Sequence, residues 1–427
     1  MRKVILLLLV AAPLFGQTAA YRVRFERPYT LHVTATLPID GDTLEMTATR
    51  PGDVAEVDAR GWPALVRNLR VAPPSRRPAA RRLASPTVHG WRLAHPMHGR
   101  IAIRYDVDYA PLAAAGWPAP RETAFADARN FVVIGRSLFI TTPAMRGARV
   151  AFDLPRGWHA VMPSTDEIVD NLVVFTRAAP DVVTAGRFRL TVCAMGHWRA
   201  QRAEVRRRLA PAVARFVRMF GFRERANYLV VLLPQREHGG ESFHDSFALT
   251  VDDPADAPAW ANLIAHEVFH FWNGWRLRGA DYASSQWFQE GFTEYEANRA
   301  TGLDKLAKHV ENYRRLAQSL EDGTRKGPPL YSAGALVAFA WDVMIRDATG
   351  GKRTLDDFWR ALWLRTDGGR RPWTWPDLRA ALDRTAPRDW EAFYRAHIHG
   401  REPLPLGEIF AVSSRQSWGA PTSPAGN

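Results

Sequence analysis

The chain has 427 residues, of which 46% are hydrophobic, and it carries a formal net charge of +13 at pH 7. A chain of this length and composition can bury a sizeable core and can form two or three domains, which excludes a disordered or fibrous protein. The positive charge comes mostly from scattered arginines without interleaved aromatic residues, so we expect a solvated basic surface and no nucleic-acid partner.

The first twenty residues have the pattern of a secretory signal peptide. Arg2 and Lys3 precede an apolar run, and the small residues Thr18, Ala19 and Ala20 follow it. A retained membrane anchor is the alternative, but the run is shorter than the roughly 20 residues that a spanning helix needs. We therefore expect cleavage, export to the periplasm or medium, and no stable membrane insertion afterwards. Cys193 is the single cysteine, so no internal disulfide can form.

Residues 21–196 predict a β-rich, sandwich-like domain. Apolar residues alternate with polar ones from Leu31 to Leu37 and again from Ile101 to Tyr109, which is the period of a half-buried strand. The stretch from Pro73 to Pro86 lacks this period and is rich in proline and arginine, so we expect an exposed loop there.

Residues 197–412 predict a second, mostly helical domain. The period becomes helical between Val205 and Met219, and Gly221 stands where a helix stop is expected. One apolar strand is expected from Tyr228 to Leu233, and helices are expected from Ala259 onward. Residues 413–427 are rich in serine, glycine and proline and predict a flexible tail. The fold class is therefore α+β.

The string His266-Glu267-Val268-Phe269-His270 is the first sign of chemistry. Two histidines four residues apart share one face of a helix and can bind one Zn²⁺, while the glutamate between them can take a proton from metal-bound water. By chance, such a string occurs in roughly a few per cent of chains of this size, so a metal site needs a second, independent sequence signal.

The segment from Trp287 to Tyr295 supplies that second signal. A catalytic zinc needs three protein ligands and one open position, and Glu290 can complete a His₂Glu set. The alternative is that Glu290 and Glu294 form an ordinary solvated pair one helical turn apart. Glu294 is equally compatible with an outer role, in which it holds a ligand in place.

These residues resemble the glycyl aminopeptidase family of gluzincin zinc peptidases. The zinc helix of that family is similar to the segment HEVFHFWNGWRLRG, and its second-ligand helix is similar to WFQEGFTEY. Later parts of the family are similar to the segment from Leu330 to Asp357 and to GREPLPLGEIF. The likeness covers roughly residues 200 to 410. It implies a thermolysin-like catalytic domain over residues 197–412, one zinc per chain, and a peptide or protein substrate.

Three features depart from the family pattern. The connection from His270 to Glu290 is short, which implies a trimmed loop, and the chain ends too soon for the PDZ domain that members often carry. In the segment His238 to Ser246, the glutamate follows Gly239 and Gly240 directly. The resemblance implies that this substrate-binding segment contacts the free amino group of the substrate, with Glu241 as the nearest carboxylate.

The resulting hypothesis is removal of small amino-terminal residues, with Glu267 as general base and Tyr331 as donor to the oxyanion. Tyr331 is nearly as compatible with a plain core position, and His238 and His244 are weaker candidates for assisting. A zinc endopeptidase and an inactive peptide-binding protein of the same fold remain alternatives. The sequence leaves the oligomeric state open.

Overall fold

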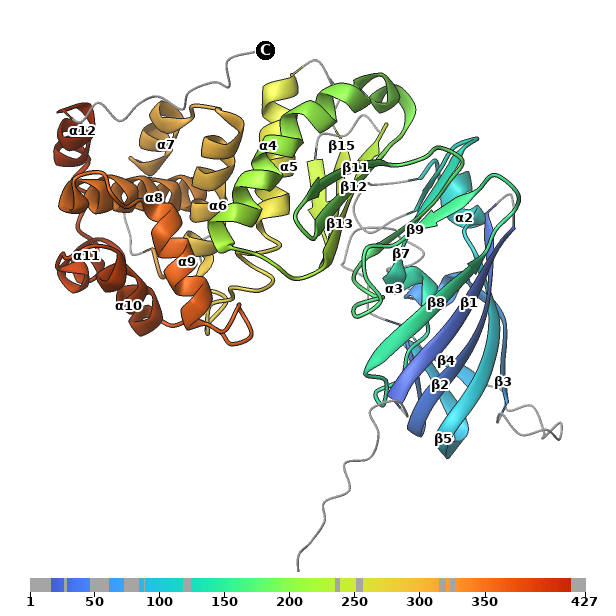
Figure 1. The fold of residues 1–427 in the computed structure, drawn as a ribbon. Coiled ribbons are helices and arrows are strands. Elements are labelled where there is room, and N and C mark those ends of the chain that lie inside the picture. The colour runs from blue at the N-terminus through green and yellow to red at the C-terminus, as the bar shows by residue number, and fades with distance from the viewer. Residues whose placement is uncertain are drawn as a thin grey trace, which may run out of the picture. The chain divides into compact units, whose positions relative to one another are not determined.

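A computed structural model of the chain describes residues 17–26, 29–46, 61–72, 84–87, 89–117, 124–234, 239–250, 256–314, 320–322 and 327–415. Strands fill its first part and helices dominate its second part (Figure 1), which confirms the predicted α+β class. Within these residues no helix combines the length and the apolar character that crossing a bilayer requires.

The contacts divide the chain into two compact units. The first unit comprises residues 1–180 and 231–250, and the second comprises residues 181–230 and 251–427. The first unit thus ends at residue 180, before the expected boundary at residue 196, and it also includes residues 231–250. The reason is that Asn171 and Leu172 hold this segment by hydrogen bonds, with Leu172 N donating to Ser246 Oγ at 3.0 Å.

The first unit contains a six-stranded sheet in the order β3-β5-β2-β1-β8, with β4 paired to β5. Its strands are β1 (Thr18–Glu26), β2 (Thr30–Glu45), β3 (Val66–Ala72), β4 (Ala84–Thr87), β5 (Gly90–Asp108) and β8 (Gly147–Asp153). Buried and exposed residues alternate along β1, as the period-two pattern predicts. Because β1 begins at Thr18, the last three residues of the expected signal segment lie in this strand.

A four-stranded sheet provides the second layer of this unit, in the order β6-β7-β10-β9. Its strands are β6 (Phe125–Ala126), β7 (Asn130–Ile134), β9 (His159–Val161) and β10 (Leu172–Thr176). Phe25 of the first sheet stacks on Phe131 and Phe175 of the second, with ring centroids 5.7 and 5.2 Å apart. This aromatic contact joins the two sheets in the sandwich-like arrangement that the sequence predicts.

The expected loop between Pro73 and Pro86 is partly wrong. Residues 73–83 lie outside the described part, and Ala84–Thr87 forms strand β4 against β5. Composition predicted a loop as far as Pro86, but backbone pairing with the long strand β5 makes Ala84 to Pro86 part of a strand.

Short elements complete the first unit. They are η2 (Trp62–Leu65), α2 (Ala110–Ala114), α3 (Gly135–Leu138) and the hairpin strands β14 (Gly239–Ser242) and β15 (Ser246–Thr250). The hairpin pairs Glu241 with Ala248 and Gly239 with Thr250.

The second unit starts with the hairpin β11 (Asp181–Ala185) and β12 (Phe188–Ala194), followed by η3 (Gly196–Gln201) and α4 (Arg202–Phe220). Helix α4 ends at Gly221, whose φ of 58° is left-handed, so the predicted helix stop is confirmed. Strand β13 (Ala226–Leu233) then runs from the residues of the second unit into those of the first, and matches the expected apolar strand.

Eight helices of the described part follow. They are α5 (Ala257–Phe269), α6 (Gln286–Thr301), α7 (Leu306–Tyr313), α8 (Pro328–Thr349), α9 (Leu355–Arg365), α10 (Trp375–Thr385), α11 (Trp390–His397) and α12 (Leu406–Arg415). Helix α12 includes the first three residues of the expected tail, and residues 416–427 lie outside the described part.

The segment between α8 and α9 contains the local signals that end one helix and begin the next. Helix α8 ends at Gly350 with φ 57°, and α9 begins with a capping box in which Asp357 Oδ2 accepts from the Thr354 backbone N–H at 2.9 Å. A left-handed glycine stop and a capping box are the standard signals for ending one helix and beginning another. This segment therefore has a structural role.

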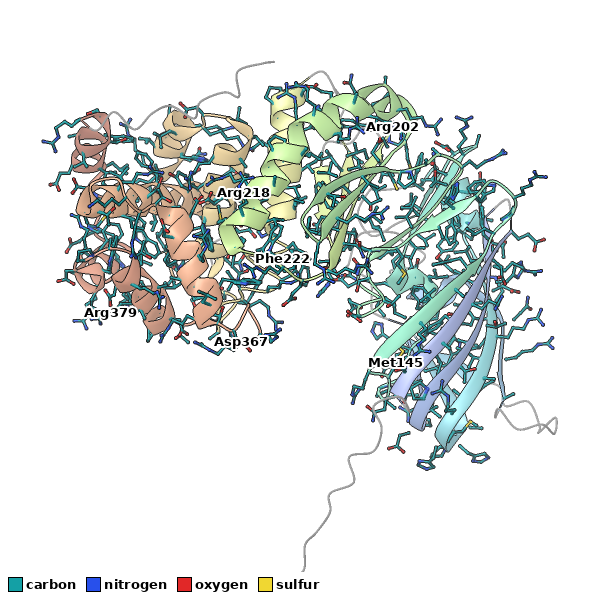
Figure 2. All side chains as sticks on the ribbon, in the orientation of Figure 1. Met145, Arg202, Arg218, Phe222, Asp367 and Arg379 are labelled. Atoms are coloured by element: carbon teal, nitrogen blue, oxygen red, sulfur yellow. The ribbon has the colours of Figure 1, made fainter. Side chains whose placement is uncertain are left out.

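Aromatic packing and a buried ion network hold the helices of the second unit. Trp272 stacks on Phe220 with ring centroids 5.6 Å apart. Phe222, two residues after the end of α4 and labelled in Figure 2, packs edge-on against Trp272 with ring centroids 5.8 Å apart. The Glu296 carboxylate of α6 is fully buried and bonds Arg215 of α4, Arg299 of α6 and the Trp359 indole of α9. These bonds fix α6 relative to α4 and α9.

Candidate metal centre

Helix α5 places both histidines of the His-Glu-x-x-His string in its final turn. Asp256 caps its N-terminus by accepting from the Ala259 backbone N–H at 3.2 Å, and apolar residues such as Ile264 and Val268 bury one side of the helix. His270 is the residue at which the helix ends. The side chains of His266 and His270 are only 7% and 12% exposed.

Helix α6 supplies the carboxylate that the sequence assigns as third ligand. Glu290 Oε2 lies 3.4 Å from His266 Nε2 and 3.4 Å from His270 Nε2, and the two Nε2 atoms are 3.1 Å apart. With metal–ligand distances near 2.0–2.1 Å, a tetrahedral zinc holds its ligand atoms roughly 3.3 Å from one another. The three atoms therefore have the spacing that a zinc ion requires.

The hydrogen bonds of the outer ring nitrogens support the same conclusion. His270 Nδ1 lies 2.9 Å from the Asn273 carbonyl oxygen, and His266 Nδ1 lies 3.2 Å from Glu294 Oε2. Both partners are acceptors, so in a neutral imidazole each Nδ1 carries the hydrogen and each Nε2 presents a lone pair. Two lone pairs and a carboxylate oxygen in mutual contact repel one another unless a cation lies between them. The donor set thus fits a divalent metal.

Close contacts between the histidines and the carboxylates also shift the pKa values at this site. Burial by itself lowers the pKa of His266, but hydrogen bonds with Glu290 and Glu294 outweigh burial and raise that pKa. Burial raises the pKa of Glu290, whereas positive charge on His270 and hydrogen bonds from both histidines hold it well below its usual range. The carboxylates therefore favour positive charge at this point, and a divalent cation supplies it with both imidazoles neutral.

Two outer contacts escaped the sequence analysis. Lys305 Nζ, just before α7, lies 2.8 Å from Glu294 Oε1, so a chain of contacts runs from Lys305 through Glu294 to His266. The buried Asn273 donates through Nδ2 to the carbonyls of Phe288 and Gln289, which ties the end of α5 to α6. The sequence offers no signal for Lys305, because the loop that carries it has no motif.

The position of Glu294 decides between the two readings that the sequence left open for it. Its carboxylate is 13% exposed and bonds the outer nitrogen of His266, which is the way second partners orient metal-binding histidines. It is therefore not part of a solvated surface pair.

Helices α6 and α8 cross at two glycines. A Cβ on Gly334 would lie 1.9 Å from the Trp287 carbonyl oxygen, and one on Gly291 would lie 2.3 Å from Gly334 Cα. The backbones thus touch directly, one residue after Glu290. This crossing brings Tyr331, one turn earlier on α8, to the metal centre, where its ring lies nearly parallel to that of His266 at a centroid distance of 6.0 Å.

Tyr331 thus lies beside the candidate metal centre. Burial first, and then the negative charge of Glu290, raise the pKa of its phenol above the usual value, so the phenol keeps its proton. Glu267 lies on α5 beside His266, and its Oε2 is buried with no hydrogen-bond partner among the described residues. A buried carboxylate oxygen without a partner is costly unless a ligand or water occupies it.

The expected substrate-binding residues lie in the first unit. Gly239, Gly240 and Glu241 form most of β14, and the Glu241 side chain is largely buried. A Cβ on Gly240 would lie 2.4 Å from the Phe247 ring, so packing within the hairpin suffices to require this glycine. His244 pairs with Asp245 at 2.9 Å, and His238 lies outside the described residues.

Residues 259–347 match the family model for the M61 glycyl aminopeptidases. This range holds the three candidate ligands as well as Glu267 and Tyr331. None of the curated proteins matches the chain.

Solved structures of low sequence identity share the fold. The chain is similar to an aminopeptidase N family protein from Idiomarina loihiensis, with a TM-score of 0.69 and 15% identity over 92% of this chain and 78% of the other. It is also similar to an M1 zinc metallopeptidase from Deinococcus radiodurans, with a TM-score of 0.55 and 17% identity over 92% of this chain and 95% of the other. A variant of that metallopeptidase bound to a Tyr-Ser-Ala substrate gives the same TM-score of 0.55 and the same 17% identity over the same shares of both chains.

The family match falls within the helical part of the chain, and the solved structures share the whole arrangement of a strand-rich first part and a helical second part. Residues 259–347 of the chain are therefore similar to the M61 glycyl aminopeptidases, and the chain has the fold of solved M1 zinc metallopeptidases.

Proposed function

We propose that the protein uses one zinc per chain to remove small amino-terminal residues from peptides. The observation that carries the proposal is the convergence of His266, His270 and Glu290 inside the segment that matches the M61 family. The M1 zinc metallopeptidase of similar fold was solved with a tripeptide, which supports peptides as the substrate class.

Glu267 and Tyr331 divide the chemistry in this proposal. When bound, zinc acts as a Lewis acid and lowers the pKa of water toward neutrality. The unpartnered Oε2 of Glu267 accepts the proton of the attacking water and passes it to the departing amine. The Tyr331 phenol donates to the carbonyl oxygen as negative charge develops there.

Glu241 is our candidate for binding the ammonium group of the substrate, on the strength of the sequence segment that contains it. A carboxylate is the natural partner for an ammonium group inside a protein site. A zinc endopeptidase and an inactive peptide-binding protein are the competing functions. We further propose export through the leader at residues 1–20, which the mass of the mature protein in the periplasm or medium will test.

The first experiment compares the wild type with Glu267→Gln on a panel of short free peptides. The amide keeps the shape of the side chain but cannot act as a base, so turnover falls by about 10²–10⁴-fold while zinc remains bound. Glu402→Gln makes the same change at an exposed residue and serves as the control. Near-normal turnover by Glu267→Gln contradicts the assignment of the base, and no turnover by any zinc-loaded form favours the inactive binding protein.

The second experiment separates aminopeptidase from endopeptidase activity. Each peptide is offered with a free and with an N-acetylated amino terminus, to the wild type and to Glu241→Gln. We expect the wild type to cleave the free peptides only, and Glu241→Gln to raise KM for them because an ion pair with the ammonium group is lost. Equal cleavage of both forms identifies an endopeptidase.

A further inference from the structure

The outer face of the six-stranded sheet in the first unit carries a groove of about 630 Å³. The opposite face of the same strands is the core side, where Tyr21, Val33 and Ile103 are buried. The described residues lining the groove include four arginines, Arg22, Arg70, Arg104 and Arg149, and no aspartate or glutamate. The groove is therefore strongly positive.

Strand register explains how these arginines come together. Arg70 of β3 pairs with Arg104 of β5, Arg104 pairs with Thr34 of β2, and Thr34 pairs with Arg22 of β1, so these residues form one row across four strands. Residues in one row share a face and lie about 4.8 Å apart from strand to strand. The strands β1, β2, β3 and β5 are visible together in Figure 1, and nitrogen-tipped side chains project from them in Figure 2.

The neighbouring row forms the floor of the groove. It consists of small side chains, with Ala72, Ala102, Thr36 and Ala20 in register and Arg149 of β8 at its end. The long arginine side chains thus lie beside a row of short alanine and threonine side chains, and this difference in length leaves a groove wide enough for an extended peptide.

Three of the four arginines have no acidic partner among the described residues. Arg70, Arg104 and Arg149 make no hydrogen bond or ion pair in the described part of the chain, whereas Arg22 bonds Asp153 at 2.8 Å with 63% of its side chain exposed. Asp106, on the same face as Arg104, is already held by His32 at 2.6 Å and by Asn68 at 2.7 Å. Like charges directly opposite each other, as in Arg70 and Arg104, destabilise a sheet unless an anion lies between them.

We propose that this groove, formed by Arg22, Arg70, Arg104, Arg149 and the small residues between them, binds an acidic peptide segment. Guanidinium groups form paired hydrogen bonds with carboxylates, so the arginines of the groove can bind the acidic side chains of a peptide. Among the described residues, no exposed aromatic side chain lines the groove to stack on bases, which disfavours single-stranded nucleic acid. The exposed large hydrophobic residues of the described part are Tyr282 and Leu364, both in the second unit, so this face lacks the apolar anchors of membrane-surface binding.

The test measures binding of a short labelled peptide rich in glutamate by fluorescence anisotropy, at several salt concentrations, with its glutamine counterpart as control ligand. All proteins carry Glu267→Gln so that the peptide is not consumed. The groove variant combines Arg70→Gln, Arg104→Gln and Arg149→Gln. The matched variant removes the same charge from exposed arginines of the second unit, by Arg206→Gln, Arg223→Gln and Arg225→Gln.

We expect the acidic peptide to bind more tightly as salt is lowered, and the groove variant to bind it about tenfold more weakly or worse. The matched variant should stay within about twofold of the parent, because distant exposed charges act weakly through solvent. Absence of binding, or equal loss in both variants, overturns the proposal. Binding of heparin or anionic vesicles through the same arginines, without binding of the peptide, overturns the assignment to a peptide. Thermal unfolding of each variant confirms that it is folded, and the outcome is independent of peptidase activity.

Discussion

Replacing Glu294 by glutamine tests how the protein holds its metal-binding histidine. The carboxylate contacts His266 through Oε2 at 3.2 Å and Lys305 through Oε1 at 2.8 Å. Glutamine keeps the shape but has a single oxygen. If that oxygen accepts from His266, the amide hydrogens face the Lys305 ammonium, and if it turns to Lys305, the amide hydrogens face His266 Nδ1. One charge-assisted hydrogen bond is lost in either orientation.

The size of the effect follows from that loss. A hydrogen bond to a charged group contributes about 1.5–3 kcal/mol, and about 1.4 kcal/mol corresponds to a tenfold change in affinity. Zinc affinity should therefore fall about 10–100-fold, which agrees with the usual effect of removing an outer partner of a metal-binding histidine. Lys305→Met should act in the same direction with a smaller effect, because it leaves Glu294 in place.

Zinc affinity is measured by competition with a chelator of known strength, so the result does not depend on catalysis. Glu402→Gln, at an exposed position, controls for the loss of one negative charge. Unfolding curves of the metal-free proteins show whether a variant has lost stability instead. An unchanged zinc affinity in Glu294→Gln would refute the argument that this carboxylate orients His266.

Three further predictions concern the same unit. Elemental analysis should find one zinc per chain, lost in His266→Ala, and the absence of stoichiometric zinc after reconstitution would contradict the metal centre. Tyr331→Phe should lower kcat more than it raises KM, because an oxyanion donor acts in the transition state, and an unchanged kcat would return Tyr331 to a packing role. Glu296→Gln should lower the free energy of unfolding by about 3 kcal/mol in denaturant titrations, because Arg215 and Arg299 lose their buried partner, and a change below about 1 kcal/mol would show that Asp356 compensates.

Local spacing explains why the sequence could point to the candidate metal ligands that the structure brings together. His266 and His270 stand one helical turn apart, so any helix through this segment brings them to one face. Glu290 lies in an equally clear helical segment, and the donor set known for catalytic zinc selects it as the third ligand. The helix stop at Gly221 was predictable for a similar reason, since its left-handed backbone is a local property of glycine.

Contacts that form only in the folded chain explain what the sequence missed. Ala84 to Pro86 looked like the end of a loop, but these residues lie in strand β4, which pairs with β5. The segment 231–250 joins the first unit through Asn171 and Leu172, more than 70 positions away. Neither contact leaves a mark in composition or periodicity, because strand pairing and side-chain hydrogen bonds between separate segments are set by the folded arrangement.

The sequence by itself determined the α+β order, the candidate metal ligands and the resemblance to the glycyl aminopeptidases, because these properties depend on residues that are close along the chain. The tertiary structure alone decided that Glu294 and Lys305 support His266, that Gly291 and Gly334 bring Tyr331 to the centre, and that scattered arginines form one groove. The physical reason is that helix crossing and strand register set contacts between residues far apart in sequence. The net charge of +13 looked like a general property of the surface, and only the register of β1, β2, β3 and β5 concentrates part of it at one place.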